Sequence, residues 1–186
     1  MPQLVQSDRR LLLDLARAAV EGTARRSPIA TPDEAALAPG LQAPAAAFVT
    51  LRLRGELRGC IGMLRHDVAL WVNVRDSAVA AARDDPRFPP VQTTELAGIE
   101  IEISVLQEPV LLPDATLFEV GRHGVIVERD GARALLLPQV APEMGWGATE
   151  MLQAVCRKAG LRPDAWRDEG TRLYVFESSC FGAADC

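Results

Sequence analysis

Apolar and polar positions along this chain follow a helical period in some segments and a strand period in others. A first helix is predicted from Ser7, which can cap it, to about Thr23, because apolar residues recur at helical spacing: Leu11, Leu12, Leu15, Ala16, Ala19 and Val20. Two more helices are predicted, one over 68–83 that Asp67 can cap and one over 148–159 that ends before a glycine.

Other segments alternate apolar and polar residues, as strands do. The clearest is 99–106, in which apolar residues point one way and polar residues the other: Glu100, Glu102 and Ser104. The other predicted strands, of which the first four pair as two hairpins, are 47–54, 57–62, 124–129, 132–137 and 172–177. Because hairpins alternate with helices, the sequence predicts an α+β fold with mainly antiparallel sheet and flanking helices, rather than a doubly wound α/β fold.

Composition narrows the class of protein. The 186 residues suit one domain or two closely joined subdomains, and 48% hydrophobic residues can build a core. Nucleic-acid binding is not expected, because the formal net charge is −5 and no basic run occurs. No apolar run approaches the roughly 20 residues that cross a bilayer, and no signal peptide is recognisable. Four cysteines fit neither a disulfide scaffold nor a zinc pattern, so a cytoplasmic protein with reduced thiols is expected.

The segment Leu57-Arg58-Gly59-Cys60-Ile61-Gly62 carries the leading candidate site. In a regular strand Arg58 and Cys60 leave the same face, and a guanidinium near the thiol favours the nucleophilic thiolate. Gly59 and Gly62 flank the thiol, and glycine within a strand often marks the close approach of a ligand or of other backbone. The alternative is that Cys60 is a packing residue and that the glycines serve packing or a bulge.

The register of the first hairpin decides which side chains accompany Cys60. A two-residue loop at Gly55-Glu56 would set Leu51 opposite Cys60 and drive Arg58 to the apolar face. A three-residue loop ending at Gly55 sets Thr50 opposite Arg58 instead. Because burying an unpaired charge is costly, the second register is predicted. Cys60 then shares its face with Phe48, Thr50, Arg52 and Arg58.

Two histidines, His66 and His123, are candidate general bases. His66 lies in a polar turn and is expected to be exposed. His123 lies between Gly121 and Gly124 and is the preferred base, with a turn histidine bonded to backbone as the alternative. Two histidines with scattered acids do not make a persuasive ligand set, so no metal is expected.

Two charged residues are further candidate ligand contacts. Arg87 can clamp a carboxylate or phosphate, or instead pair with Asp85 and fix a turn. Glu102 is expected on the polar face of its strand, where it accepts a proton or, as a structural partner, orients Arg58.

Three candidates lie toward the C-terminus. Gln139 and Trp146 fall in an irregular stretch of the kind that carries binding residues, although Trp146 can instead fill the core. Lys158 is the single lysine beside 19 arginines. Codon bias explains most of this imbalance, but a retained lysine can be needed as a compact ammonium, and near a helix C-terminus it also pairs with the helix dipole.

Several segments taken together resemble a known family. They are Phe48-Val49-Thr50-Leu51, the 57–62 segment, Asp85-Pro86-Arg87-Phe88, Ile101-Glu102-Ile103-Ser104-Val105-Leu106, Gly121-Arg122-His123-Gly124, Leu136-Leu137-Pro138-Gln139-Val140-Ala141, Trp146, Cys156-Arg157-Lys158-Ala159-Gly160-Leu161 and Ala165-Trp166. This combination is similar to the AMMECR family, whose prokaryotic members are called AmmeMemoRadiSam system protein A. The similarity covers about residues 10–181, so 1–186 is expected to form a single domain of this type.

The resemblance implies an α+β fold of two subdomains with a cleft between them, lined by the Cys60 segment. It also implies a Memo-type protein and a radical S-adenosylmethionine protein as genomic neighbours and candidate partners. It supplies no settled reaction, substrate or cofactor, so function has to be argued from the residues.

Two functions are consistent with these residues. The first is a ligand- or substrate-binding protein with thiol chemistry on a small molecule or a partner protein, in which Cys60 is the nucleophile and His123 the base. The residues expected to contact the ligand are Arg58, Gly59, Gly62, Arg87, Glu102, Gln139, Trp146 and Lys158. The second is a non-catalytic accessory module that binds or delivers a substrate to a partner enzyme, favoured by the lack of a convincing acid–base pair.

Overall fold

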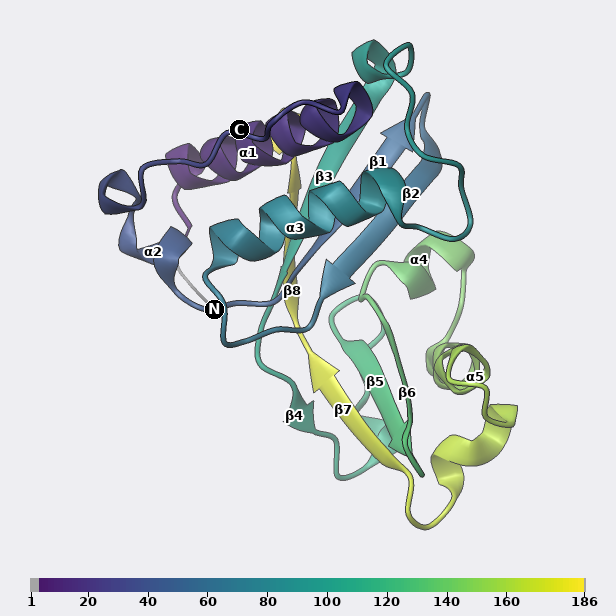
Figure 1. The fold of residues 1–186 in the computed structure, drawn as a ribbon. Coiled ribbons are helices and arrows are strands. Elements are labelled where there is room, and N and C mark those ends of the chain that lie inside the picture. The colour runs from purple at the N-terminus through teal and green to yellow at the C-terminus, as the bar shows by residue number, and fades with distance from the viewer. Residues whose placement is uncertain (1–3, 186) are drawn as a thin grey trace. The chain divides into compact units, whose positions relative to one another are not determined.

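The computed structural model describes residues 4–185, and the chain divides into two compact units. The first unit comprises Met1–Leu106 together with Ser179–Cys186, and the second comprises Gln107–Ser178. Each unit has a four-stranded sheet and its own apolar core (Figure 1). The predicted α+β class with mainly antiparallel sheet and flanking helices is confirmed.

The first unit contains a sheet in the order β2-β1-β3-β8 and two long helices. The strands are β1 (Ala47–Leu53), β2 (Glu56–Met63), β3 (Ile99–Leu106) and β8 (Ser178–Gly182). The helices are α1 (Gln6–Arg25), α2 (Pro39–Gln42) and α3 (Leu70–Arg83), with short 3-10 turns at Glu34–Ala36, Leu96–Gly98 and Ala183–Asp185. Because β2 has a neighbour only on one side, it is an edge strand of this sheet.

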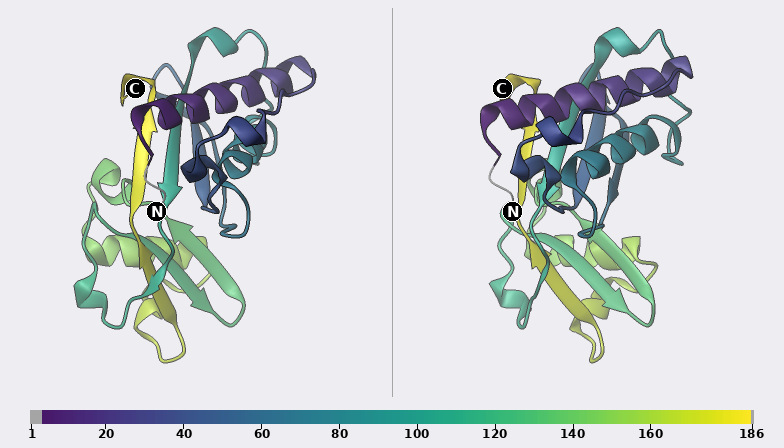
Figure 2. Two further views of the ribbon diagram at one scale, coloured as in Figure 1. Left: turned by 90° about the vertical axis from the view of Figure 1, so that its left-hand side faces the viewer. Right: turned by 60° about the vertical axis from the view of Figure 1, so that its left-hand side comes forward.

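Helices α1 and α3 lie on the same face of this sheet (Figures 1 and 2). The buried side chains between helices and sheet include Leu12, Ala16, Val20, Leu70, Val74, Val49, Leu51, Ile101, Ile103 and Val105. The predicted faces of β3 are therefore confirmed, with the isoleucines in the core and Glu100 and Glu102 on the other face. Ser104, although on that polar face, is itself buried.

The β1–β2 hairpin turns at Arg54 and Gly55, which have φ values of 55° and 83°. Positive φ at both central residues is characteristic of a two-residue type I′ turn, and Leu53 pairs with Glu56 across it. Neither of the two loops expected from the sequence is therefore correct. Gly55 has the positive φ that was expected for it in the three-residue loop, but the turn contains only two residues.

A β-bulge shifts the pairing of β1 and β2 by one residue beyond the turn. Arg52 pairs with Leu57, whereas Leu51 pairs with Gly59, so Arg58 is the extra residue. Thr50 consequently lies opposite Cys60, not opposite Arg58. The predicted register is wrong by two residues, and because side chains alternate with a period of two, Cys60 still shares a face with Thr50.

Both long helices of the first unit begin away from their predicted caps. Helix α1 begins at Gln6, before Ser7, and the carboxylate of Asp8 accepts a hydrogen bond from the backbone N–H of Val5 at 3.2 Å. Helix α3 begins at Leu70, and its N-terminal residues make no side-chain cap. Asp67, the expected cap, instead lies 3.7 Å from Arg65 as a surface ion pair.

The second unit contains a sheet in the order β4-β7-β5-β6, packed against helix α5. Its strands are β4 (Val110–Leu111), β5 (Gly124–Arg129), β6 (Ala132–Leu136) and β7 (Arg172–Phe176). Its helices are α4 (Val140–Met144) and α5 (Ala148–Lys158), with 3-10 turns at Ala115–Leu117 and Pro163–Arg167. Asp130 and Gly131, with φ values of 49° and 83°, form a type I′ turn in the predicted hairpin. The short strands β4 and β8 were not predicted.

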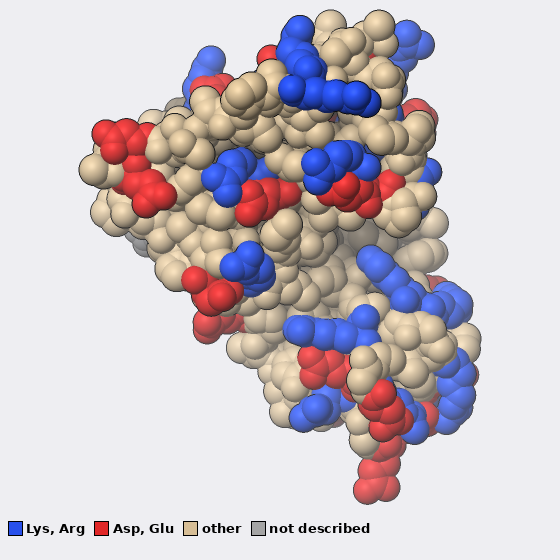
Figure 3. Space-filling model, in the orientation of Figure 1, with Lys and Arg blue, Asp and Glu red and all other residues tan. Residues whose placement is uncertain are grey.

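Charged side chains of both signs are interspersed on the face drawn in Figure 3. Among residues 4–185, no helix is both long and apolar enough to cross a membrane.

Candidate functional site

The backbone of Cys60 is clamped at the open edge of β2. Its N–H donates to the Asp85 carboxylate at 2.8 Å, and its carbonyl accepts from the Arg87 guanidinium at 3.4 Å. Asp85 and Arg87 are themselves joined by two side-chain hydrogen bonds, from Nε at 2.9 Å and from Nη2 at 2.7 Å. An edge strand exposes unpaired backbone groups, and this pair covers those of Cys60.

The clamp is a strongly stabilised ion pair. Asp85 is only 3% exposed, and hydrogen bonds from Arg87, together with the Cys60 N–H, lower the pKa of its carboxyl to about 2. The pKa of Arg87 is raised, mainly by its hydrogen bonds with Asp85, and the nearby charge of Cys60 contributes in the same direction. Asp85 and Arg87 therefore both stay charged at neutral pH, and an ion pair holds the backbone of Cys60.

The side chain of Cys60 points to the face of the sheet opposite α1 and α3. The Thr50 hydroxyl donates to the Cys60 sulfur at 3.3 Å across the β1–β2 pair. Because the N–H and C=O of Cys60 both turn outward to the clamp, Thr50 and Cys60 form the closer, non-hydrogen-bonded type of cross-strand pair. Thr50 is buried and Cys60 is partly exposed, so the sulfur is held in place yet accessible.

Arg58 is held by Glu95, which the sequence did not suggest. Its Nε and Nη2 donate to the two carboxylate oxygens of Glu95 at 2.7 and 3.0 Å, and these bonds lower the Glu95 pKa. The remaining Nη1 is buried and makes no hydrogen bond to any residue of the described chain. Glu102 therefore does not orient Arg58; it pairs with Arg52 at 3.3 Å.

Packing explains both glycines beside the thiol. A Cβ on Gly59 would lie 2.3 Å from the carbonyl oxygen of Ala81, so α3 can approach β2 only at a glycine. A Cβ on Gly62 would lie 2.1 Å from the ring of Phe48, its cross-strand partner. These contacts account for the two glycines without a ligand, and their role as ligand contacts stays a prediction.

His123 lies in the second unit and is engaged in a turn. Its Nδ1 accepts a hydrogen bond from the backbone N–H of Glu119 at 3.1 Å, and its ring contacts Phe118 at 6.0 Å between centroids. Because Nδ1 accepts a hydrogen bond, the neutral ring carries its own proton on Nε2. Nε2 then has no free lone pair with which to accept a proton. His123 therefore has the geometry of a turn histidine bonded to backbone, which was the alternative considered from the sequence.

The remaining candidates also lie in the second unit. Gln139 immediately precedes α4, and Trp146 is partly buried against the core of this unit. Lys158 is exposed at the last position of α5. His66, the other histidine, is partly buried, not exposed as expected.

The sequence model of the AMMECR1 family matches residues 13–181 of the chain. The chain belongs to the AMMECR1 family. A protein of Methanothermobacter thermautotrophicus is 43% identical over 185 residues, covering 96% of this chain and 95% of that relative. Protein NEQ441 of Nanoarchaeum equitans is 40% identical, covering 91% and 97%.

The AMMECR1 fold is also seen in a crystal structure. The uncharacterized protein PH0010 from Pyrococcus horikoshii has a TM-score of 0.88 and 38% identity, covering 92% of this chain and 89% of that chain. The family resemblance drawn from the sequence motifs is therefore confirmed.

In this AMMECR1 chain the Arg87 guanidinium reaches the carbonyl of Cys60, whereas Arg58 pairs with Glu95. The pairing of Arg87 with Asp85, considered from the sequence as the alternative for Arg87, is present. Asp85 was considered only as a turn residue, and Glu95 was missed. Both are carboxylates in a proline-rich loop, where no periodicity indicates which strand a side chain will reach.

The chemistry available around Cys60 is that of a positioned thiol. Among the described residues, no three His, Cys, Asp or Glu side chains come together as a metal site would require. A second thiol, Cys156, is fully buried in the other unit, and burial raises its pKa. Cys60 thus differs from Cys156 in its exposure and in the hydroxyl that donates to its sulfur.

Proposed function

We propose that this AMMECR1 protein binds a small molecule or a segment of a partner protein on the sheet face around Cys60, and that the Cys60 sulfur reacts with it. The observation that carries the proposal is the Thr50 hydroxyl, which donates to the Cys60 sulfur at 3.3 Å. This bond from a buried hydroxyl holds the sulfur in one position while the cysteine stays partly exposed.

The clamp on the Cys60 backbone supports the same proposal. A reactive group has to be held near its productive position by its surroundings, and here the N–H and the carbonyl of Cys60 are both fixed by side chains. The carboxylate of Asp85 holds the Cys60 N–H, and the guanidinium of Arg87 neutralises the charge of that carboxylate. The guanidinium of Arg87 is half-exposed, so it can also meet an anionic group of a ligand.

The proposed step is a nucleophilic attack. The thiol loses its proton to water, the thiolate donates an electron pair to an electrophilic carbon, and a sulfur–carbon bond forms. The leaving group departs with the electrons of the broken bond. His123 has no part in this step, because its Nδ1 is engaged with Glu119.

Intact-mass spectrometry of protein purified from its natural host tests this proposal. We expect a covalent adduct on a fraction of the chains, located on Cys60 by peptide mapping, and its absence in Cys60→Ser. A Cys60→Ser variant that fully replaces the natural protein in the host, with no adduct on the natural protein, would contradict the proposal.

A second function is favoured by a different observation. Large apolar side chains are exposed in the 110–120 segment of the second unit: Val110, Leu111, Leu117 and Val120. Exposed apolar side chains that gather in one segment are typical of protein-binding surfaces. An accessory module that delivers a substrate to a Memo-type or radical S-adenosylmethionine protein would use such a surface. Co-purification lost in Val110→Glu, with Cys60 unmodified, would support this second function over the first.

A further inference from the structure

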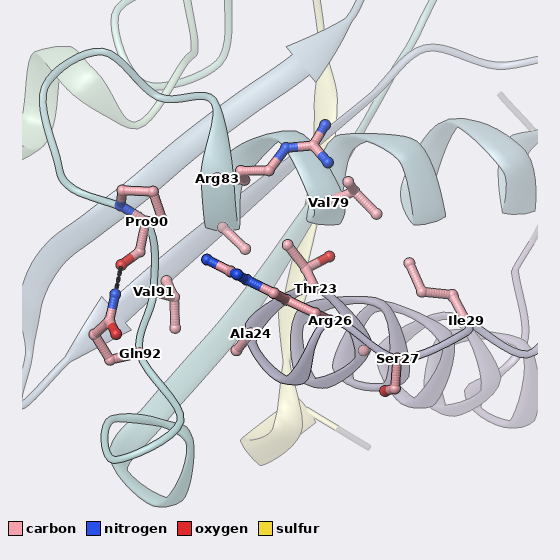
Figure 4. Close-up of a pocket in the computed structure, with 12 residues that line it drawn as sticks. Thr23, Ala24, Arg26, Ser27, Ile29, Val79, Arg83, Pro90, Val91 and Gln92 are labelled. Carbon is pink, nitrogen blue, oxygen red and sulfur yellow. Dashed lines mark hydrogen bonds between the residues drawn. The ribbon is translucent and has the colours of Figure 1, made fainter.

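A cavity of about 500 Å³ lies in the first unit, where the C-terminal ends of α1 and α3 meet (Figure 4). Its walls come from the last turns of the two helices, from the chain after α1, and from residues 90–92. Small-molecule sites have volumes of roughly 300–1,000 Å³, so this cavity is large enough for a compact ligand.

Arg26 occupies a position in this wall that normally favours glycine. It follows the last residue of α1 with φ of 54°, the left-handed conformation that ends many helices. A side chain with a Cβ is disfavoured in this conformation. Nevertheless the residue at this position is an arginine. Its guanidinium makes no hydrogen bond or ion pair within residues 4–185. The side chain of Arg26 points toward residues 90–92 (Figure 4).

The second cation of the wall is already paired. Nε and Nη2 of Arg83 donate to both carboxylate oxygens of the neighbouring Asp84, at 2.8 and 3.0 Å. Arg26 is therefore the charged side chain that has no side-chain partner among the described residues that line the cavity.

The rest of the cavity is mixed in polarity. Ile29, Val79 and Val91 contribute aliphatic side chains, and Thr23, Ser27 and Gln92 contribute polar ones. The chain can fold back over α1 because Gly22 has no Cβ, which would lie only 2.7 Å from Ile29 Cγ1. On the opposite wall, the Val91 N–H donates to the carbonyl of Ala82 at 2.8 Å and fixes the returning loop on α3.

We propose that this cavity binds a small aliphatic carboxylate, with the carboxylate on Arg26 and the hydrocarbon body against Ile29, Val79 and Val91. An arginine fork matches a carboxylate with two parallel hydrogen bonds. The ends of α1 and α3 carry the partial negative charge of helix C-termini. That charge opposes a dianion such as phosphate more strongly than a monoanion, so a monocarboxylate is the favoured class.

Titration of the whole chain with sodium isovalerate at constant ionic strength tests the proposal. We expect a Kd in the millimolar range, as suits a ligand of this size. Arg26→Gly should weaken binding by about tenfold or more, since a charge-assisted hydrogen bond is lost. The same substitution should raise Tm by about 2 °C, because glycine relieves the left-handed backbone.

Arg54→Gly is the matched control. Arg54 also has a positive φ, of 55°, but it lies in the β1–β2 turn and does not line the cavity. This variant should gain stability in the same way and bind isovalerate as the natural protein does. The proposal is overturned if isovalerate fails to bind up to about 50 mM, or if Arg26→Gly binds it unchanged. It is also overturned if inorganic phosphate or neutral 3-methylbutan-1-ol binds as tightly as isovalerate.

Discussion

Replacing Asp85 by Asn removes the charge from the clamp on Cys60 while keeping its shape. The buried carboxylate accepts four hydrogen bonds, one from the Cys60 N–H and three from the backbone and guanidinium of Arg87. An asparagine oxygen can still accept from the Cys60 N–H, but the ion pair with Arg87 is lost. The substitution therefore removes the ion pair together with the hydrogen bonds that the replaced oxygen accepts from Arg87.

The magnitude follows from the pKa of the Asp85 carboxyl. In the folded chain it is about 2, against 3.8 for an unperturbed group. A pKa lowered on folding stabilises the protein above the unfolded value and loses that contribution as the pH falls through the folded value. At about 1.4 kcal/mol for each pH unit, Asp85 contributes about 2 kcal/mol at neutral pH, and this is lost between about pH 4 and pH 2.

Urea unfolding at a series of pH values measures this contribution. Trp71 reports on the first unit once Trp146 and Trp166 of the second unit are replaced by Phe. Asp85→Asn should lower the free energy of unfolding by about 2 kcal/mol at pH 7 and by less than about 0.5 kcal/mol at pH 2.

Asp84→Asn is the neighbouring control for the same measurement. Asp84 also pairs with an arginine, but both side chains are about half exposed, so the expected loss is under about 1 kcal/mol. If the two variants lose the same stability at pH 7, or if the Asp85→Asn difference does not shrink toward pH 2, then the clamp has been assigned wrongly.

Four further substitutions test the site and the core. Thr50→Val should slow alkylation of Cys60 at pH 7 by about fivefold without unfolding the protein, because one hydrogen bond to sulfur is lost; an unchanged rate would remove Thr50 from the site. Ile103→Ala should cost about 2–5 kcal/mol in urea unfolding, because Ile103 is fully buried, and a cost near 0.5 kcal/mol would contradict its placement. Gly62→Ala should cost about 1–3 kcal/mol, and Phe48→Leu should restore part of that loss by making room for the new methyl group.

The strands that carry the site were predictable because their patterns are local. Alternation along 99–106 identified β3 and its buried face. The hairpin was found from its alternation and its glycine, although the loop was assigned a wrong length. The face of Cys60 was nevertheless correct, because the register error was two residues and so preserved the alternation of side chains.

The partners of the site residues were harder to predict because they are distant in sequence. Glu95 reaches Arg58 from 37 positions away, through a loop that has three prolines and no period. The bulge at Arg58 has no signature in the hydrophobic pattern, yet it determines where that guanidinium points. Likewise, the clash that excludes a side chain at Gly62 depends on the ring of Phe48 across the hairpin, and pattern alone cannot reveal it.

The proposed function requires Cys60 to be a reactive thiol rather than a packing residue. Its most direct test is iodoacetamide labelling of the folded protein, with Cys180 and Cys186 replaced by Ser and each remaining thiol followed by mass spectrometry. Cys156, which is fully buried, serves as the internal reference. We predict that Cys60 labels at least about tenfold faster than Cys156 at neutral pH, since the Cys60 sulfur is accessible to the reagent and Cys156 is fully buried. Labelling of Cys60 only in denaturant, or no faster than Cys156, would contradict the account.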